Sequence, residues 1–437
     1  MKITAIGGYN EFGRNMTLLR FGDDSVIVDM GIRLDRVLVH EDTDISKMGG
    51  EELVAKGIIP DDVAVNGNVR AIILTHGHLD HIGAVPTLAA KYKAPIIGTP
   101  YTIELIKNEE RFNKNFKIDS IEVLEPGKKL QITPAIEVEF IHVTHSIPQT
   151  VMAAFRGPDG TVLYANDFKF DNSPMMGEKP DYARIRELGK NGVKCLIVES
   201  TRVSNEQRTP SEKIVRKMLL DNFVRSEEDK GLIVTTFSSH IARISNIVKI
   251  AQLIDRKPVL LGRSMGKYCN IAQRLGILDL SKDASIYANP KSIRRILKRI
   301  VEDGKEKYLL VVTGHQGEPD ALLSKIANRS LDYKIEKDDQ VIFSADVIPN
   351  PINVANRYAL ETKLKIQGAR LIKDVHVSGH ASREDHRDLL KMLQPQNIIP
   401  CHGDLTMLSS YAELAEDCGY ELNKNLFLIR NGQNVEL

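Results

Sequence analysis

The most informative part of the chain reads Ala71-Ile-Ile-Leu-Thr-His-Gly-His-Leu-Asp-His81, an apolar run that ends in metal-binding side chains. The apolar residues at its start predict a buried strand, and Gly77 indicates where that strand ends. A polar loop with solvated histidines is the alternative interpretation. Three histidines and one aspartate within six positions are too dense a cluster for that interpretation.

The ligand-type residues of this stretch fall into two pairs. His76 and His78 are two residues apart, so an extended backbone points both side chains the same way. Asp80 and His81 follow where the chain enters a predicted helix, His81–Tyr92, and they can face a second cation beside the first. One zinc ion takes three or four ligands at roughly 2.0–2.3 Å, so further ligands must come from other parts of the chain.

Three further predicted strands end in residues of the same kind. In Phe140-Ile-His-Val-Thr-His-Ser-Ile-Pro148, His145 lies at the strand end and is the candidate ligand, whereas His142 lies mid-strand and is expected to be structural. Asp167 ends the strand that begins at Val162. Asp29 closes another strand, where it could support a metal-bound histidine or serve as a turn residue.

The pattern His-x-His-x-Asp-His resembles the signature of the metallo-β-lactamase superfamily. In that pattern His145 is similar to the third histidine and Asp167 to the bridging aspartate. The resemblance implies an α/β fold, an αββα sandwich, with two metal ions. It leaves the substrate open, because members cleave lactams, thioesters, lactones and nucleic acids.

Length and composition predict a soluble globular protein with more than one domain. A chain of 437 residues is too long for one ordinary core, and 42% hydrophobic and 27% charged residues are typical of globular proteins. The net charge of +1 means that a nucleic-acid partner would need a local basic groove. No apolar run approaches the roughly 18 residues of a membrane span, so we expect no membrane partner.

The cysteines and the N-terminus indicate a cytoplasmic protein. The four cysteines form no Cys-x-x-Cys pair, which predicts reduced thiols rather than a disulfide framework. The start Met1-Lys-Ile-Thr-Ala-Ile-Gly-Gly8 predicts a short strand and lacks the apolar region of a signal peptide.

The middle of the chain has a different pattern of predicted helices and strands. The predicted strand Cys195–Glu199 ends in an acid, and after Ser204 helical segments alternate with predicted parallel strands at 231–236, 259–261, 308–313 and 340–343. This alternation predicts an α/β insertion of roughly 150 residues. We therefore expect three segments, 1–203, 204–364 and 365–437, of which the last completes the first fold.

One predicted helix of the insertion, Lys291–Ile300, separates apolar from basic residues. Its basic face consists of Lys291, Arg294, Arg295, Lys298 and Arg299. A solvated amphipathic helix and a stripe that binds a nucleic-acid backbone both fit this pattern.

Ligand-like segments return after the insertion, with His380 in Val375-His-Val-Ser-Gly-His-Ala-Ser382 and His402 in Ile398-Ile-Pro-Cys-His-Gly-Asp404. They resemble motifs B and C of the β-CASP nucleases, in which an acid such as Glu199 precedes an inserted domain. Six further stretches resemble the ribonuclease J family: Glu11–Met16, Asp167–Asp171, Thr236–Ser239, Gly262–Met265, Thr313–Pro319 and Ser378–Ala381. The chain departs from bacterial members at His315 and is expected to lack their usual extra C-terminal domain, so it resembles the shorter archaeal branch.

The resemblance implies a role for individual residues. The expected ligands are His76, His78 and His145 for one divalent cation, Asp80, His81 and His402 for the other, and Asp167 between them. Histidine and carboxylate ligands favour zinc and are compatible with manganese. The implied catalytic residues are Asp80, His380 and Glu199.

The implied substrate is single-stranded RNA. RNA-cleaving members resemble this chain in having a histidine at position 402, where DNA-repair members typically have valine. In the ribonuclease J family a pocket for the 5′ phosphate implies processive 5′→3′ removal of nucleoside monophosphates from 5′-monophosphorylated RNA. The expected substrate-binding residues are Ser238, Ser239, Arg263, Ser264, His376, Ser378, Gly379 and His380. Replacement of Gly379 is expected to obstruct the phosphate and to leave the metal ligands untouched.

Other functions fit the sequence less well. A small-molecule hydrolase would need neither the α/β insertion nor the returning histidines, and an inactive scaffold would have lost ligands. The main alternative is an endoribonuclease that resembles the archaeal cleavage and polyadenylation factors, although those often begin with KH domains. Internal cleavage by the same site stays open, as does assembly into a homodimer.

Overall fold

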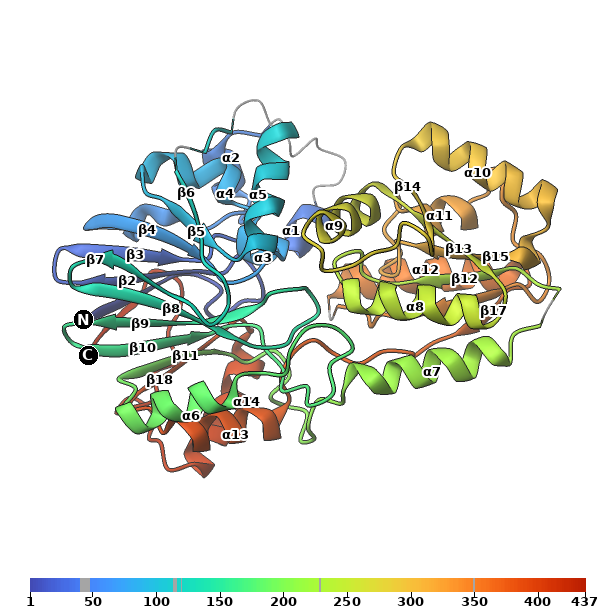
Figure 1. Cartoon of the computed structure of the whole chain (residues 1–437). Coiled ribbons are helices and arrows are strands. Elements are labelled where there is room, and N and C mark those ends of the chain that lie inside the picture. The colour runs from blue at the N-terminus through green and yellow to red at the C-terminus, as the bar shows by residue number, and fades with distance from the viewer. Residues whose placement is uncertain (40–47, 113–115, 119, 228, 349) are drawn as a thin grey trace. The chain divides into compact units, whose positions relative to one another are not determined.

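The chain folds into two units that each have their own β-sheet core (Figure 1). The computed structural model describes residues 1–39, 48–112, 116–118, 120–227, 229–348 and 350–437. Unit 1 comprises Met1–Asn172, Glu178–Thr209 and Gly379–Leu437, and unit 2 comprises Ser173–Gly177 and Pro210–Ser378. For comparison, the sequence predicts domain boundaries at 203/204 and 364/365.

Two sheets form the centre of unit 1. The first has the strand order β19-β1-β2-β3-β4-β5-β6, antiparallel from β1 to β3 and parallel from β3 to β6. The second has the order β18-β11-β10-β9-β8-β7. The strands are β1 Lys2–Gly7, β2 Met16–Phe21, β3 Asp24–Val28, β4 Asn68–Leu74, β5 Ile96–Gly98, β6 Ile121–Val123, β7 Lys129–Thr133, β8 Ile136–His142, β9 Val151–Gly157, β10 Gly160–Ala165, β11 Cys195–Glu199, β18 Ile398–Cys401 and β19 Asn434–Glu436.

The facing sides of these sheets form the core of unit 1. Alternate residues of each strand point inward, such as Val26 and Val28 in one sheet and Phe140 and Tyr164 in the other. Helices α6, α13 and α14 pack on the outer face of the second sheet, and α2, α4 and α5 lie over the first (Figure 1). The helices are α1 Leu34–Val39, α2 Gly50–Ala55, α3 Leu79–Ile82, α4 Val85–Leu88, α5 Pro100–Phe112, α6 Tyr182–Asn191, α13 Arg383–Leu393 and α14 Leu405–Asp417. Unit 1 is therefore the αββα sandwich that the family resemblance implied.

Unit 2 is built on one parallel sheet with the order β14-β13-β15-β12-β16-β17. Its strands are β12 Leu232–Thr235, β13 Lys257–Leu261, β14 Ser285–Tyr287, β15 Tyr308–Val312, β16 Gln340–Phe343 and β17 Arg370–Ile372. Its helices are α7 Glu212–Val224, α8 Ile241–Leu253, α9 Arg263–Arg274, α10 Pro290–Asp303, α11 Leu322–Ala327 and α12 Pro351–Ile366. The predicted alternation of helices with parallel strands is confirmed.

The helix predicted over His81–Tyr92 is wrong as a single element. The structure divides this segment into α3, α4 and a 3-10 helix, Ala89–Tyr92. Gly83 ends α3, and Pro86, which lacks an N–H group, can be accommodated only in the first turn of a new helix. None of the described helices is long and apolar enough to cross a membrane.

A fully buried guanidinium ties together four segments of unit 2. Arg243 of α8 is 0% exposed and pairs with Glu212 of α7, with 2.7 Å between Nη2 and Oε2. Its Nη1 donates to the backbone oxygen of Ser344 at 2.8 Å and lies 3.2 Å from His376 Nδ1. Arg243 therefore connects α7 and α8 to the end of β16 and to the segment that leads back to unit 1.

We predict that Arg243→Met lowers the free energy of unfolding by about 3–5 kcal/mol, because it leaves the buried Glu212 carboxylate without its guanidinium. Urea denaturation followed by circular dichroism measures this loss. Adding Glu212→Gln should restore part of it, since the buried charge is then gone. A loss below about 1 kcal/mol, the value of an exposed ion pair, would show that the pair contributes little.

Candidate metal centre

The candidate ligands lie where strands of unit 1 end. His76, His78, Asp80 and His81 follow β4, whereas His145, Asp167 and His402 follow β8, β10 and β18. The backbone is left-handed at two of these ends, with φ of 56° at Asp167 and 53° at His402, and also at Asp29, which follows β3, with φ of 59°. Residues other than glycine rarely adopt this conformation, and it is concentrated at functional sites. This uncommon backbone conformation turns the side chains at these positions toward the group of candidate ligands.

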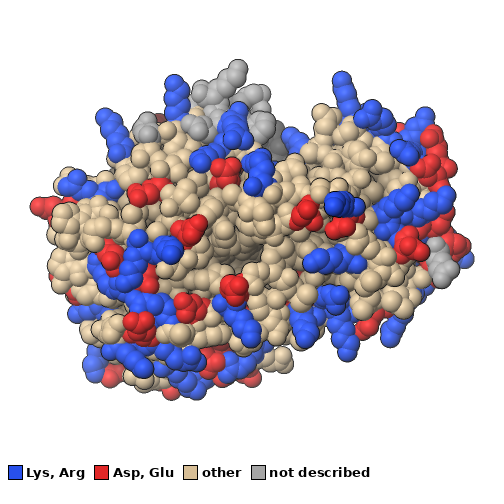
Figure 2. Space-filling model, in the orientation of Figure 1, with Lys and Arg blue, Asp and Glu red and all other residues tan. Residues whose placement is uncertain are grey.

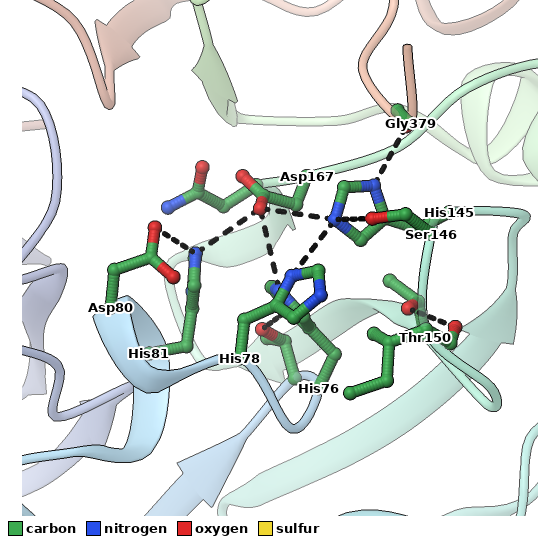
Figure 3. A network of polar contacts seen from close by, with 12 residues as sticks. His76, His78, Asp80, His81, His145, Ser146, Thr150, Asp167 and Gly379 are labelled. Carbon is green, nitrogen blue, oxygen red and sulfur yellow. Dashed lines mark hydrogen bonds and ion pairs between the residues drawn. The ribbon is translucent and has the colours of Figure 1, made fainter. Parts of the chain in front are cut away.

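The first group of ligand atoms surrounds a common centre (Figure 3). His78 Nδ1 lies 3.2 Å from His76 Nε2 and 3.1 Å from His145 Nε2. Asp167 Oδ2 lies 3.3 Å from His76 Nε2 and 3.4 Å from His145 Nε2. Three imidazoles and one carboxylate oxygen therefore converge.

The second group shares Asp167 with the first. Asp167 Oδ2 lies 3.3 Å from His81 Nε2, and Asp167 Oδ1 lies 3.4 Å from His402 Nε2. Asp80 Oδ2 lies 3.7 Å from His81 Nε2 and 3.5 Å from His402 Nε2. The structure thus brings together all seven residues that the sequence singled out as ligands.

The spacing of these atoms fits bound metal ions. In a tetrahedral site with bonds of about 2.0–2.1 Å, neighbouring ligand atoms are about 3.3 Å apart, close to most of the separations given above. His402 Nε2 and Asp167 Oδ1 are also buried without a hydrogen-bond partner among the described residues. Leaving such atoms unsatisfied costs free energy, and a cation between them would remove that cost.

Burial and neighbouring charges set the protonation of the ligands. Burial lowers the pKa of His145 to about 4, and it also lowers the pKa values of His76, His78 and His402. Neutral imidazole is the form that binds a metal ion. Burial acts the same way on His81, but Asp167, Asp29 and Asp80 outweigh it and raise the pKa of His81. This surplus of carboxylate charge stabilises a cation.

Asp29 and Thr75 are not candidate ligands, but each contacts the ring of a candidate ligand through a hydrogen bond. Asp29 is 0% exposed, and its Oδ2 lies 2.7 Å from His81 Nδ1 while its Oδ1 accepts from the Thr75 N–H at 2.9 Å. Thr75 Oγ1 lies 3.2 Å from His76 Nδ1. Because these contacts occupy Nδ1 of both rings, Nε2 of each is directed at Asp167.

Glu199 and His380 form a hydrogen-bonded pair beside the ligands. Glu199 Oε2 lies 2.8 Å from His380 Nδ1, and Oε1 accepts from the Phe168 N–H at 2.9 Å. His380 Nδ1 lies 3.8 Å from Asp167 Oδ1. Burial lowers the pKa of His380, but Glu199 and Asp167 outweigh it and raise this pKa to about 9. An oriented imidazolium therefore faces the shared carboxylate.

Sequence reasoning missed the loop after β1. The Phe12 ring stacks on His402 with 4.6 Å between centroids, and the Gly13 N–H donates to His402 Nδ1 at 3.4 Å. Asn15 Nδ2 lies 3.1 Å from His81 Nε2. The stretch Glu11–Met16 shows a family resemblance in the sequence, but nothing in its spacing indicates that it folds onto the ligands.

The expected substrate-binding residues divide between the two units. Gly379 and His380 lie in unit 1 with the ligands. The other six belong to unit 2: Ser238 and Ser239 precede α8, Arg263 and Ser264 begin α9, and His376 and Ser378 lie in the segment leading back to unit 1.

Gly379 lies directly against a candidate ligand. Its backbone oxygen is 2.7 Å from His145 Nδ1. A Cβ atom at this position would lie 2.9 Å from Ser146 Cβ and 3.0 Å from His145 Cε1. The expectation that replacing Gly379 leaves the metal ligands untouched is therefore wrong, because only glycine lets the backbone approach His145 this closely.

We predict that Asp167→Ala reduces the metal content from about two divalent ions per chain to nearly none, since its carboxylate serves both groups. His402→Ala should lose about one ion, and the matched control His142→Ala should lose none, because His142 Nε2 contacts the Glu178 backbone oxygen instead. Elemental analysis of gel-filtered protein gives these numbers. Equal metal content in wild-type and Asp167→Ala protein would contradict the shared carboxylate.

We predict that Gly379→Ala weakens zinc binding by about 10- to 100-fold, the usual effect of disturbing a contact that orients a ligand. Calorimetric titration of the metal-free protein measures the affinity. Gly49→Ala is the control, because a Cβ there meets nothing within 4 Å. Unchanged zinc affinity in a stable Gly379→Ala protein would refute this role of the glycine.

Comparison with known families covers most of the chain. The model of the metallo-β-lactamase superfamily matches residues 9–192. The model described as "Ribonuclease J, beta-CASP domain" matches residues 229–359. The model described as "Zn-dependent metallo-hydrolase RNA specificity domain" matches residues 368–424.

Comparison with individual proteins gives the family. Ribonuclease J of Methanocaldococcus jannaschii is 54% identical, over 99% of this chain and 98% of that protein, and ribonuclease J of Pyrococcus abyssi is 51% identical, over 100% and 97%. Ribonuclease J of Synechocystis sp. is 32% identical over 100% of this chain but only 66% of its own length. A crystal structure of a protein of unknown function from Enterococcus faecalis V583 has the same fold, with a TM-score of 0.68 at 18% identity over 100% of this chain and 99% of that chain. The chain therefore belongs to the ribonuclease J family, in the β-CASP branch of the metallo-β-lactamase superfamily.

Proposed function

We propose that this protein is a metal-dependent ribonuclease that removes nucleoside monophosphates processively from the 5′ end of 5′-monophosphorylated RNA. The observation that carries this proposal is the convergence of seven ligand-type side chains in two groups that share Asp167. Membership of the ribonuclease J family supports RNA as the substrate, as does the RNA specificity domain matched over residues 368–424.

We assign two divalent cations to this centre. The ligand assignment is His76, His78 and His145 for one, Asp80, His81 and His402 for the other, and Asp167 for both. Histidine and carboxylate donors favour zinc, and manganese is the second choice. Bound divalent ions lower the pKa of water and offset the charge that builds up on the attacked phosphate.

His380 is the chain's own acid at this centre. Because Glu199 holds its Nδ1, the imidazolium can direct Nε2 to a phosphate oxygen or give a proton to the leaving oxygen. Glu199 acts through His380 and is a positioning residue. Asp80 belongs to the second cation group, so its removal should stop hydrolysis through loss of that group.

Two arguments support 5′→3′ degradation of RNA. His402 stands where DNA-repair members of the β-CASP branch typically have valine. The hydroxyl of Ser378 and the backbone N–H groups near Gly379 suit a terminal phosphate, as they do in the family that this chain resembles. Ser238, Ser239, Arg263, Ser264 and His376 are the further candidates for binding the 5′ end.

We predict that RNA labelled at a 5′ monophosphate releases labelled mononucleotide as its first product. A DNA of equal length should be cut far more slowly, and Asp80→Ala should release nothing. Thin-layer chromatography of early time points measures the product. The matched substrate is the same RNA with a 5′ hydroxyl, which should react slowly because it lacks the charge that the pocket binds.

Two outcomes would contradict this direction and substrate. Release of mononucleotides from the 3′ end, or equal rates on DNA and RNA, would exclude the proposed specificity. Rapid cutting of circular RNA, which has no end, would favour the endoribonuclease that the same chemistry allows.

A further inference from the structure

Helix α10 of unit 2 has one apolar and one basic face, as the sequence predicted. Its residues Ile293, Ile296, Leu297 and Ile300 are buried in the core of unit 2. This packing fixes the rotation of the helix about its axis. The opposite face is therefore held permanently toward solvent.

The exposed face of α10 carries five cations: Lys291, Arg294, Arg295, Lys298 and Arg299. Lys298 pairs with Glu302 at 3.8 Å and Arg299 with Asp303 at 3.2 Å. Within the described part of the chain, no carboxylate lies in ion-pair range of the other three. Figure 2 shows Lys and Arg side chains projecting from this part of the surface, at the upper right.

The order of charges along α10 opposes the stability of the helix. Lys291 lies in the first turn, and Glu302 and Asp303 lie in the last, where the helix dipole favours the opposite signs. Like charges three or four residues apart, such as Arg294 and Lys298, also repel. By contrast, α13 has two acids in its first turn and a lysine in its last. A bound polyanion would offset the repulsion among the cations of α10, because its negative charges attract each of them.

The basic face suits a phosphate backbone. It extends over about 12 Å of the helix axis, at 1.5 Å per residue, which is room for a few phosphates of one strand. The guanidinium groups of Arg294 and Arg295 can each donate two hydrogen bonds to one phosphate. Because the net charge of the chain is only +1, this attraction is local rather than a property of the whole molecule.

We propose that the basic face of α10 is a second RNA-binding site, built from residues none of which is a candidate metal ligand. It holds the backbone of single-stranded RNA through phosphates, without regard to sequence. The choice of RNA as the polyanion rests on the proposed function.

The test compares two triple variants of the full chain. Lys291→Gln/Arg294→Gln/Arg295→Gln removes the three cations of this face for which the described residues supply no acidic partner, and glutamine keeps the helix propensity. The control Lys213→Gln/Lys217→Gln/Lys249→Gln removes three exposed charges from α7 and α8 of the same unit. Fluorescence anisotropy measures binding to a long single-stranded RNA in the presence of chelator, so that the RNA stays intact.

The α10 variant should bind at least about tenfold more weakly than wild type at 0.1 M salt. Its slope of log affinity against log salt should be shallower by about 2, because each lost contact with a single strand contributes about 0.7. The control should stay near wild type in both. With metal restored, the α10 variant should hydrolyse a short 5′-monophosphorylated oligonucleotide at the wild-type rate.

Unchanged affinity and slope in the α10 variant would overturn the inference and favour an acidic protein as the partner of this face. Equal losses in both variants would also overturn it, since the effect would then be one of net charge. If wild type binds RNA through α10 but cleaves none, the proposed function fails and this site stands. If wild type cleaves RNA and the α10 variant binds like wild type, this site alone fails.

Discussion

Ring nitrogens of five histidines lie 3.3–3.8 Å from the carboxylate oxygens of Asp167, which is 1% exposed. Burial alone would raise the pKa of this carboxyl group, but His402 and His81 hold it well below its usual range. A buried negative charge surrounded by mainly neutral imidazoles is costly unless cations accompany it. The other candidate ligands are arranged so that they can hold cations beside this carboxylate.

The fold of unit 1 supplies that environment from strands that are distant in the sequence. Each ligand-bearing strand ends at the same region, and residues that carry no candidate ligand atom, such as Asp29 and Thr75, fix the ring orientations. The main part of unit 2, Pro210–Ser378, is inserted between Thr209 and Gly379. Glu199 precedes the insertion and His380 follows it, yet their side chains are 2.8 Å apart, and Thr209 donates to the His380 backbone oxygen at 2.7 Å. The hydrogen bonds that position the proposed acid, His380, therefore also join the chain segments before and after the insertion.

The sequence singles out the seven candidate ligands because they follow apolar runs that indicate strands. A dense His and Asp cluster marks one strand end, and His145, Asp167 and His402 follow other runs, but the assignment of Asp167 and His402 as ligands rests on the family resemblance. The role of Gly379 could not be predicted in this way. Its short contact with His145 joins residues 234 positions apart, and spacing along the chain contains no information about such a contact. The loop with Phe12 and Asn15 was missed for the same reason. The broken helix after His81 could have been foreseen from Gly83 and Pro86, because local backbone chemistry decides it.

Anomalous diffraction from zinc-loaded crystals would show whether two cations share the Asp167 carboxylate. We expect two peaks, one within about 2.3 Å of Nε2 of His76 and His145 and Nδ1 of His78, and one at a similar distance from Asp80, His81 and His402. Oxygens of Asp167 should contact both. A single peak, or two peaks with Asp167 turned away from either, would show that the carboxylate is not shared.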